Sequence, residues 1–188
     1  QNRFTSIDSS IGQLKALETL TVYENGLTGP FPSGIGSLVS LRRLSMHSNQ
    51  LSGPIPSVVG QLSRLTDLNL SFNDFSGPIP TEIGRLGELS SLELRSNKLQ
   101  GPLPGELGNL VSLKTIRIDD NDIKGAVPEE VCSSFESFLP SFYLDCGTRL
   151  GEAELSCPTG TCCMFCCTDG RGCGCAYEPE EQWLCFNV

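Results

Sequence analysis

Ten cysteines, all within residues 132–188, are the side chains of this 188-residue chain best suited to chemistry. Thiolates form disulfides, bind zinc or carry out redox exchange. An even number of cysteines in a short, glycine-rich segment predicts a disulfide framework. A zinc–thiolate site and a redox motif are the alternatives, because Cys163 and Cys166 have C-x-x-C spacing, although no histidine accompanies them. The cysteines are Cys132, Cys146, Cys157, Cys162, Cys163, Cys166, Cys167, Cys173, Cys175 and Cys185.

A Ser-His-Asp combination is the second candidate for chemistry. His47 is the only histidine, and Ser45 and Asp67 come near it if neighbouring strands run side by side. Because nothing in the sequence supplies an oxyanion hole or an enclosed pocket, we predict no catalytic residues and no enzymatic activity. The acidic run at 119–125 resembles a calcium loop, but Val131 stands where an EF-hand needs Glu. We therefore predict no metal site and no cofactor.

Asn69-Leu70-Ser71 is an acceptor sequence for N-linked glycosylation. We predict Asn69 as a modification site if the protein is secreted. A glycan at this position would stand in the centre of the strand surface described below. It would direct binding partners to the edges of that surface or to the back of the solenoid.

The elements that position these residues follow a repeat of 24 residues. Five successive matches to L-x-x-L-x-L-x-x-N end at the asparagines 25, 49, 73, 97 and 121. The L-x-L alternation predicts a short strand whose leucines face inward and whose intervening residues face outward. Each asparagine is expected to turn its amide into the following bend, where it satisfies buried backbone groups. No unit buries its leucines alone, so stacked neighbours complete the core.

The second half of each unit contains a Gly-Pro-x-Pro phrase, such as GPIP at 53–56. Because proline cannot donate to a strand ladder, we expect this segment to be extended and at most weakly paired. The phrase after it, such as residues 57–62, predicts a short helical or 3-10 turn. Glu129, Val131 and Phe138 have helical spacing and predict an amphipathic helix that closes the end of the stack. The segment SFYLDCG at 141–147 predicts one further strand.

The repeated phrases resemble the plant-type leucine-rich repeat of plant receptor ectodomains and polygalacturonase inhibitors, over roughly residues 2–131. The resemblance implies an α/β solenoid with a parallel ladder on its concave side and short 3-10 turns on its convex side. The cysteine pattern resembles the C-terminal flank of diatom and algal leucine-rich-repeat proteins, which brings no assigned chemistry. We predict a solenoid at 1–131, with one worn repeat and five units, and a disulfide-rich cap at 132–188.

Composition limits where the protein works and what it binds. The net charge is −9, which argues against nucleic acid and anionic membrane partners because both select basic surfaces. No stretch is apolar over the length of a membrane span. Together with the cysteines, this predicts a secreted or cell-surface protein. The chain starts at Gln1 within a repeat, which we interpret as a processed chain or a fragment.

The outward strand positions form the concave surface on which solenoids bind partners. They carry neither a continuous row of aromatic residues nor charges of a single sign, so one interpretation is that the surface is merely solvated. Phe72 stands where plant-type repeats often have an aromatic residue, which favours a structural role for it. We predict a recognition module that binds another protein or a cell-wall glycan. The alternative is a structural subunit that self-assembles through the solenoid flanks and the cap. The candidate binding residues are Tyr23, Arg43, His47, Asp67, Asn69, Phe72, Glu93, Arg95, Arg117 and Asp119.

Overall fold

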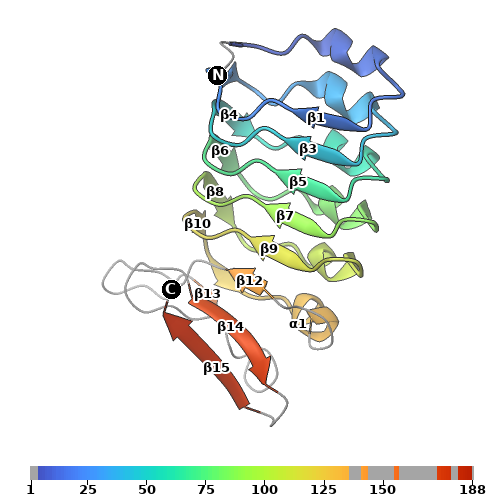
Figure 1. Cartoon of the computed structure of the whole chain (residues 1–188). Helices are drawn as coiled ribbons and strands as arrows, with labels where there is room; N and C mark the ends of the chain where they lie inside the picture. The colour runs from blue at the N-terminus through green and yellow to red at the C-terminus, as the bar shows by residue number, and fades with distance from the viewer. Residues whose placement is uncertain (1–3, 136–140, 144–154, 157–172, 179–181, 188) are drawn as a thin grey trace.

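The computed structural model describes residues 4–135, 141–143, 155–156, 173–178 and 182–187. Its repeats stack one on another along the chain, with a parallel sheet on each of two sides and short 3-10 turns beside them (Figure 1). Each complete unit contributes one strand to each sheet, followed by a 3-10 turn or, in the last unit, by helix α1. The predicted solenoid is confirmed.

The predicted ladder is a parallel sheet of six strands in the order β1-β3-β5-β7-β9-β12. Its register is uniform, so that Leu44 lies opposite Leu20 on one side and Leu68 on the other. Alternation points these leucines inward, and Leu44 and Leu68 are buried. Five repeat strands were expected; the sixth is the strand predicted at SFYLDCG. The strands are β1 (Thr19–Thr21), β3 (Arg43–Ser45), β5 (Asp67–Asn69), β7 (Ser91–Glu93), β9 (Thr115–Arg117) and β12 (Ser141–Tyr143).

A second parallel sheet, with the order β10-β8-β6-β4-β2, corrects the expectation that the Gly-Pro-x-Pro segments pair weakly. The ladder forms mainly from residues that precede the prolines: Ser52 and Gly53, for example, lie opposite Asp74 and Phe75. Proline's missing N–H is tolerated because Pro54 is the last residue of its strand. The strands are β2 (Thr28–Gly29), β4 (Gln50–Pro54), β6 (Asp74–Gly77), β8 (Lys98–Gly101) and β10 (Asp122–Ile123).

Short 3-10 turns complete the units, as predicted. They stack closely: a Cβ atom on Gly60 would lie 2.4 Å from the carbonyl oxygen of Glu82 in the next turn. Glycine at this position therefore sets how tightly successive units approach each other. The turns are η1 (Ser9–Gln13), η2 (Ser33–Ser37), η3 (Ser57–Gln61), η4 (Thr81–Arg85) and η5 (Gly105–Asn109).

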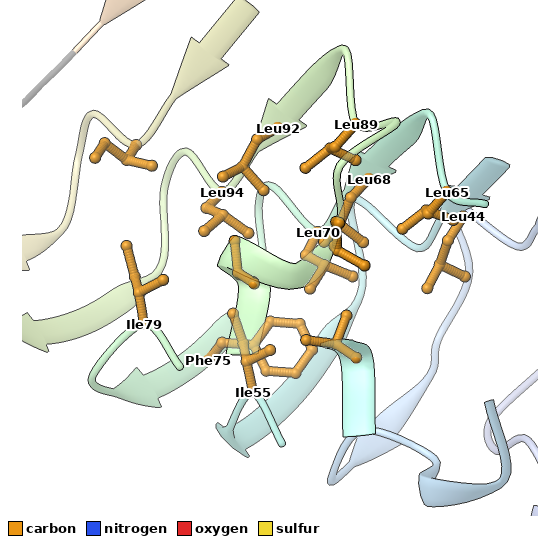
Figure 2. Packing of buried hydrophobic residues seen from close by; sticks show 14 of the residues in the cluster. Leu44, Ile55, Leu65, Leu68, Leu70, Phe75, Ile79, Leu89, Leu92 and Leu94 are labelled. Atoms are coloured by element: carbon orange, nitrogen blue, oxygen red, sulfur yellow. The ribbon is translucent and has the colours of Figure 1, made fainter. Parts of the chain in front are cut away.

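The core is one continuous cluster enclosed by the two sheets and the turns (Figure 2). Leu68 and Leu92 enter it from the six-stranded sheet, and Phe75 enters it from the second sheet. Phe75 is fully buried, with its ring centroid 6.4 Å from that of Phe31 two units away in the sequence. Because every unit packs against its neighbours, the solenoid holds the outward side chains of adjacent strands at fixed spacing.

The repeated asparagines join adjacent units, as predicted. Asn73 Nδ2 donates to the carbonyl oxygens of Met46, Leu70 and Ser71 at 3.0, 3.0 and 3.2 Å. Its Oδ1 accepts from the N–H of Leu51 at 3.0 Å. The bonds to Met46 and Leu51 cross to the preceding unit. The same pattern recurs at Asn49, Asn97 and Asn121.

Helix α1 (Glu129–Phe135) lies against η5 at the C-terminal end of the repeats. Its Val131 is fully buried, which confirms the closing helix; Phe138 lies outside the described residues. Just before the helix, β11 (Gly125–Ala126) pairs with β13 (Leu155–Ser156). Further along the chain, β14 (Cys173–Glu178) pairs with β15 (Gln182–Asn187).

Most of the predicted disulfide framework falls outside the described residues. Cys132 lies in α1, Cys173 and Cys175 lie in β14, and Cys185 lies in β15. The other six cysteines are not among the described residues. The framework as a whole, and the division between a solenoid at 1–131 and a cap at 132–188, stay predictions.

Candidate recognition surface on the six-stranded sheet

Four outward positions in each unit form the surface of the six-stranded sheet, which we call the outer sheet face. They are residues 19, 21, 23 and 24 and their equivalents at intervals of 24, up to residue 120. Every predicted binding residue lies on this face. Arg43 and Asp67 occupy the first position, Asn69, Glu93 and Arg117 the second, Tyr23, His47, Arg95 and Asp119 the third, and Phe72 the fourth.

Tyr23 and His47 form a stacked aromatic pair near the N-terminal end of the face. Their ring centroids are 4.6 Å apart and their planes differ by 11°. His47 Nδ1 and Ser45 Oγ are 2.8 Å apart, in a hydrogen bond whose donor depends on the imidazole tautomer. These contacts fix the imidazole ring, while Tyr23 is 47% exposed. The pair therefore offers a partner a preorganised aromatic surface.

Asp67 does not complete a catalytic triad with Ser45 and His47. Its carboxylate accepts a hydrogen bond from Thr66 Oγ1 at 2.6 Å and lies 3.8 Å from Arg43 Nε. Within the part of the chain that the structure describes, no hydrogen bond joins Asp67 to His47. An imidazole without an orienting carboxylate is a poor base for a serine, so the geometry gives no support for nucleophilic catalysis here.

Phe72 is the second exposed aromatic residue of the face. It is 50% exposed and its backbone has a φ of 56°. This left-handed conformation is unfavourable for a bulky side chain, and the equivalent positions hold Glu24, Ser48, Ser96 and Asp120. The guanidinium carbon of Arg95 lies 5.8 Å from the centroid of the Phe72 ring, within the range of a cation–π contact.

Asp119 is a buried carboxylate that lies beside two arginines. Its Oδ2 lies 2.9 Å from Arg95 Nε, and its Oδ1 lies 4.0 Å from Arg117 Nε. Burial disfavours the charged form and raises the pKa of Asp119, against the lowering influence of Arg95 and Arg117. Burial is the dominant influence because the carboxylate is almost wholly shielded from water. The ion pair holds Arg95 in place beside Phe72.

Asn69, the predicted glycosylation site, makes two hydrogen bonds in the centre of the face. Its Nδ2 donates to Glu93 Oε2 at 3.1 Å, and its Oδ1 accepts from the Ser71 N–H at 3.0 Å. Ser91 Oγ donates to the other carboxylate oxygen of Glu93 at 3.5 Å. The amide nitrogen that would carry a glycan is thus hydrogen-bonded to Glu93 in the next strand, β7. Glycosylation of Asn69 stays a prediction.

The charges of the face compensate one another in part, because its three arginines stand against five carboxylates, of which Glu24, Glu93 and Asp120 add negative charge. Arg43 faces Asp67, and Arg95 and Arg117 face Asp119. A surface with only a small negative excess has a weak long-range field, so it favours a partner with mixed polar and apolar groups over a highly charged one. Among the described residues, no group of three His, Cys, Asp or Glu side chains is placed to hold a metal ion. The searched part of the chain also contains no helix long and apolar enough for a membrane span.

Sequence reasoning identified the outward residues of the face but not the small polar residues that orient them. Thr66 and Ser91 were not singled out, and each donates to a predicted carboxylate. Thr66 precedes its strand, and Ser91 occupies the first outward position of β7. A signal was present in the sequence, because each lies one or two residues from its acceptor. Asp119 was predicted as an exposed acidic group, whereas its side chain is buried.

The leucine-rich-repeat family pattern matches residues 16–38, 40–62, 64–86 and 88–110. No curated protein matches the chain. Among solved structures, the chain is similar to the plant peptide hormone receptor RGFR1 in complex with RGF2, with 30% identity and a TM-score of 0.70, over 77% of this chain and 24% of that chain. It is also similar to a plant ice-binding protein, with 32% identity and a TM-score of 0.69, over 76% of this chain and 46% of that chain.

A third similar structure is the ectodomain of the receptor kinase SOBIR1 from Arabidopsis thaliana. The two chains share 32% identity with a TM-score of 0.62, over 74% of this chain and 73% of that one. By contrast, this chain spans about a quarter of RGFR1 and less than half of the ice-binding protein. The family pattern, the shared fold and these identities agree with the asparagine ladder. The chain belongs to the leucine-rich-repeat family.

Proposed function

We propose that this protein is a non-enzymatic recognition module that works outside the cytoplasm and binds another protein through its outer sheet face. The observation that carries the proposal is the presence of two exposed aromatic residues, Tyr23 and Phe72, on a rigid ladder. Each has a fixed neighbour, His47 in one case and Arg95 in the other. Aromatic residues and arginine dominate the binding energy of protein interfaces, because they bury large areas at a low entropy cost.

The proposed location and partner class draw support from similar proteins. RGFR1 is a plant peptide hormone receptor that was solved in complex with RGF2, and the SOBIR1 structure is of an ectodomain. The ten cysteines of this chain suit an oxidising compartment. We infer that the partner is a protein segment that lies across the strands, in contact with Tyr23 at one end and Phe72 two units away.

A cell-wall glycan is the second candidate ligand. The same two exposed aromatic side chains favour it, because the apolar face of a sugar ring stacks on an aromatic ring. The partly compensated charges of the face suit a neutral polar ligand. A structural subunit remains the alternative role; it predicts self-association through other surfaces. One set of variants separates these readings.

The test uses the full chain, secreted and immobilised, and two probes: the secreted proteins of the cells that make it, and soluble cell-wall polysaccharide. The double variant Tyr23→Ala with Phe72→Ser removes both aromatic side chains. Serine is chosen at residue 72 because Ser48 and Ser96 occupy the equivalent left-handed positions. We expect the double variant to lose about tenfold or more in affinity for the bound partner, the loss typical of a central interface residue.

Val111→Ser is the matched control. Val111 is an exposed apolar residue, 81% exposed, that lies outside the outer sheet face, so its substitution should leave binding unchanged. Binding of polysaccharide and not of protein would favour the glycan candidate. Equal binding by wild-type protein and the double variant would overturn the assignment of the outer sheet face. Concentration-dependent self-association in sedimentation velocity, unaffected by the double variant, would support the structural role instead.

A further inference from the structure

The C-terminal strands β14 and β15 form an antiparallel hairpin (Figure 1). Six residue pairs join the strands, from Cys173 opposite Asn187 to Glu178 opposite Gln182. In this register Cys175 lies directly opposite Cys185. Among the described residues, each of these two strands pairs only with the other.

We infer that Cys175 and Cys185 form a disulfide across this hairpin. Residues directly opposite each other in an antiparallel ladder have Cα atoms about 4.5–5.5 Å apart. A disulfide joins residues whose Cα atoms are about 4.4–6.8 Å apart, so the backbone does not have to move to form the bond. The inference goes beyond the proposed function but rests on its extracytoplasmic location, because a structural disulfide persists in an oxidising compartment.

A second cross-strand pair supports the same register. Tyr177 lies opposite Trp183, two residues from the cysteine pair on each strand. Because residues alternate between the two faces of a strand, Cys175, Tyr177, Trp183 and Cys185 share one face of the hairpin. Aromatic cross-strand pairs stabilise a register. A slip of one residue would separate the tyrosine from the tryptophan and the two cysteines from each other at the same time.

The fold also gives the disulfide a structural role. A two-stranded hairpin without a third strand is marginally stable in water, and β14 and β15 form such a two-stranded sheet. A covalent link between its strands stabilises the hairpin by restricting the unfolded chain. Cys173 lies opposite Asn187 instead of a cysteine. Cys173 therefore has no cross-strand cysteine partner within the hairpin.

Bond formation is a two-electron oxidation. The Cys175 and Cys185 thiols lose their two S–H bonds, two protons and two electrons, and one S–S bond forms. The oxidant is a disulfide, either glutathione disulfide or the active-site disulfide of a thiol oxidase, and it is reduced to two thiols. The reaction proceeds by exchange: one thiolate attacks the oxidant to form a mixed disulfide, and the second thiolate displaces the reduced oxidant.

The pairing is tested on the full chain produced through a secretory pathway. Free thiols are blocked with N-ethylmaleimide, and the protein is digested without reduction by trypsin together with a protease that cleaves after glutamate. Cleavage after Arg171 and after Glu180 or Glu181 releases a peptide whose only cysteines are Cys173 and Cys175, and it separates this peptide from one with Cys185. We expect mass spectrometry to find these peptides joined, and reduction to separate them.

Cys175→Ser and Cys173→Ser form a matched pair of variants two residues apart. Cys175→Ser should abolish the joined species and leave Cys185 open to maleimide, whereas Cys173→Ser should leave the joined species intact. The reverse pattern, or a native Cys185 that is unlinked or linked to another cysteine, overturns the pairing and leaves the proposed function untouched. Maleimide on all ten cysteines overturns the extracytoplasmic location together with the pairing. Fragmentation of the joined wild-type peptides between Cys173 and Cys175 shows which of the two carries the bond, even if one variant fails to fold.

Discussion

Replacing Asn73 by leucine tests the claim that asparagine amides hold the units together. Asn73 is 8% exposed and makes four hydrogen bonds with the backbone. Leucine has a similar size but cannot donate or accept. The substitution therefore leaves the Leu51 N–H, at a residue only 2% exposed, without its acceptor. Three carbonyl oxygens lose a donor as well.

The expected loss follows from the desolvation of these groups. One buried backbone group left without a partner costs about 1–3 kcal/mol, so Asn73→Leu should lower the free energy of unfolding by at least that amount. The midpoint of thermal unfolding should fall by about 2–4 °C per kcal/mol for a chain of this size. Thermal and urea unfolding followed by far-ultraviolet circular dichroism measure both quantities.

Asn25→Leu is the matched control within the same protein. Asn25 makes only the two bonds inside its own unit, to the carbonyl oxygens of Val22 and Tyr23. Its Oδ1 has no partner among the described residues. We expect Asn25→Leu to cost clearly less than Asn73→Leu. Equal losses in the two variants would refute the argument, because they would show that the bonds between units contribute nothing measurable beyond those inside a unit.

Three further predictions follow from the same geometry. The raised pKa of Asp119 means that the folded state holds this proton more tightly than the unfolded state does. The protonated carboxyl therefore adds to the free energy of unfolding below the ordinary pKa of 3.8, and this contribution is lost as pH rises above that value. Urea unfolding from pH 3 to pH 7 should show the loss in wild-type protein and a smaller loss in Asp119→Asn. Gly60→Ala should cost about 1–3 kcal/mol from overpacking, whereas Gly87→Ala, with nothing within 4 Å of its Cβ, should be nearly neutral; comparable losses in thermal unfolding would contradict the account of turn stacking. Phe72→Ser should leave thermal stability unchanged or slightly higher, because it relieves an unfavourable left-handed backbone, and a large loss would show that Phe72 has a structural role.

Much of the fold could be predicted from the sequence because the same hydrophobic pattern recurs in every unit. A single L-x-L phrase is ambiguous, but five in phase specify parallel strands and their register, as the pairing of Leu20, Leu44 and Leu68 shows. The second sheet was missed for a physical reason. Because proline cannot donate, the segment was expected to pair at most weakly, whereas the ladder uses the N–H and C=O groups of residues such as Ser52 before the proline.

The candidate site was only partly readable. Alternation placed Tyr23, Phe72 and Arg95 on the surface, because strand periodicity decides the side on which a residue lies. Alternation could not show that Asp119 is buried. The burial of this carboxylate depends on the way in which long side chains of adjacent strands, such as Arg95, lie across it. Nor could alternation select a partner for Cys185: cysteine pairing depends on which strands meet, and spacing along the chain does not reveal that.

The direction of the asparagine bonds has a consequence for biosynthesis. Each amide oxygen accepts from an N–H of the unit before it: Asn97 from Phe75 and Asn121 from Leu99, both at 3.0 Å. The ribosome delivers the units from the N-terminus onward, so the newest unit keeps one N–H unsatisfied until the next asparagine is translated. This pattern of bonds suits assembly from the N-terminus onward. Each strand that emerges completes the unit made just before it, and no unit waits for a segment more than one repeat downstream.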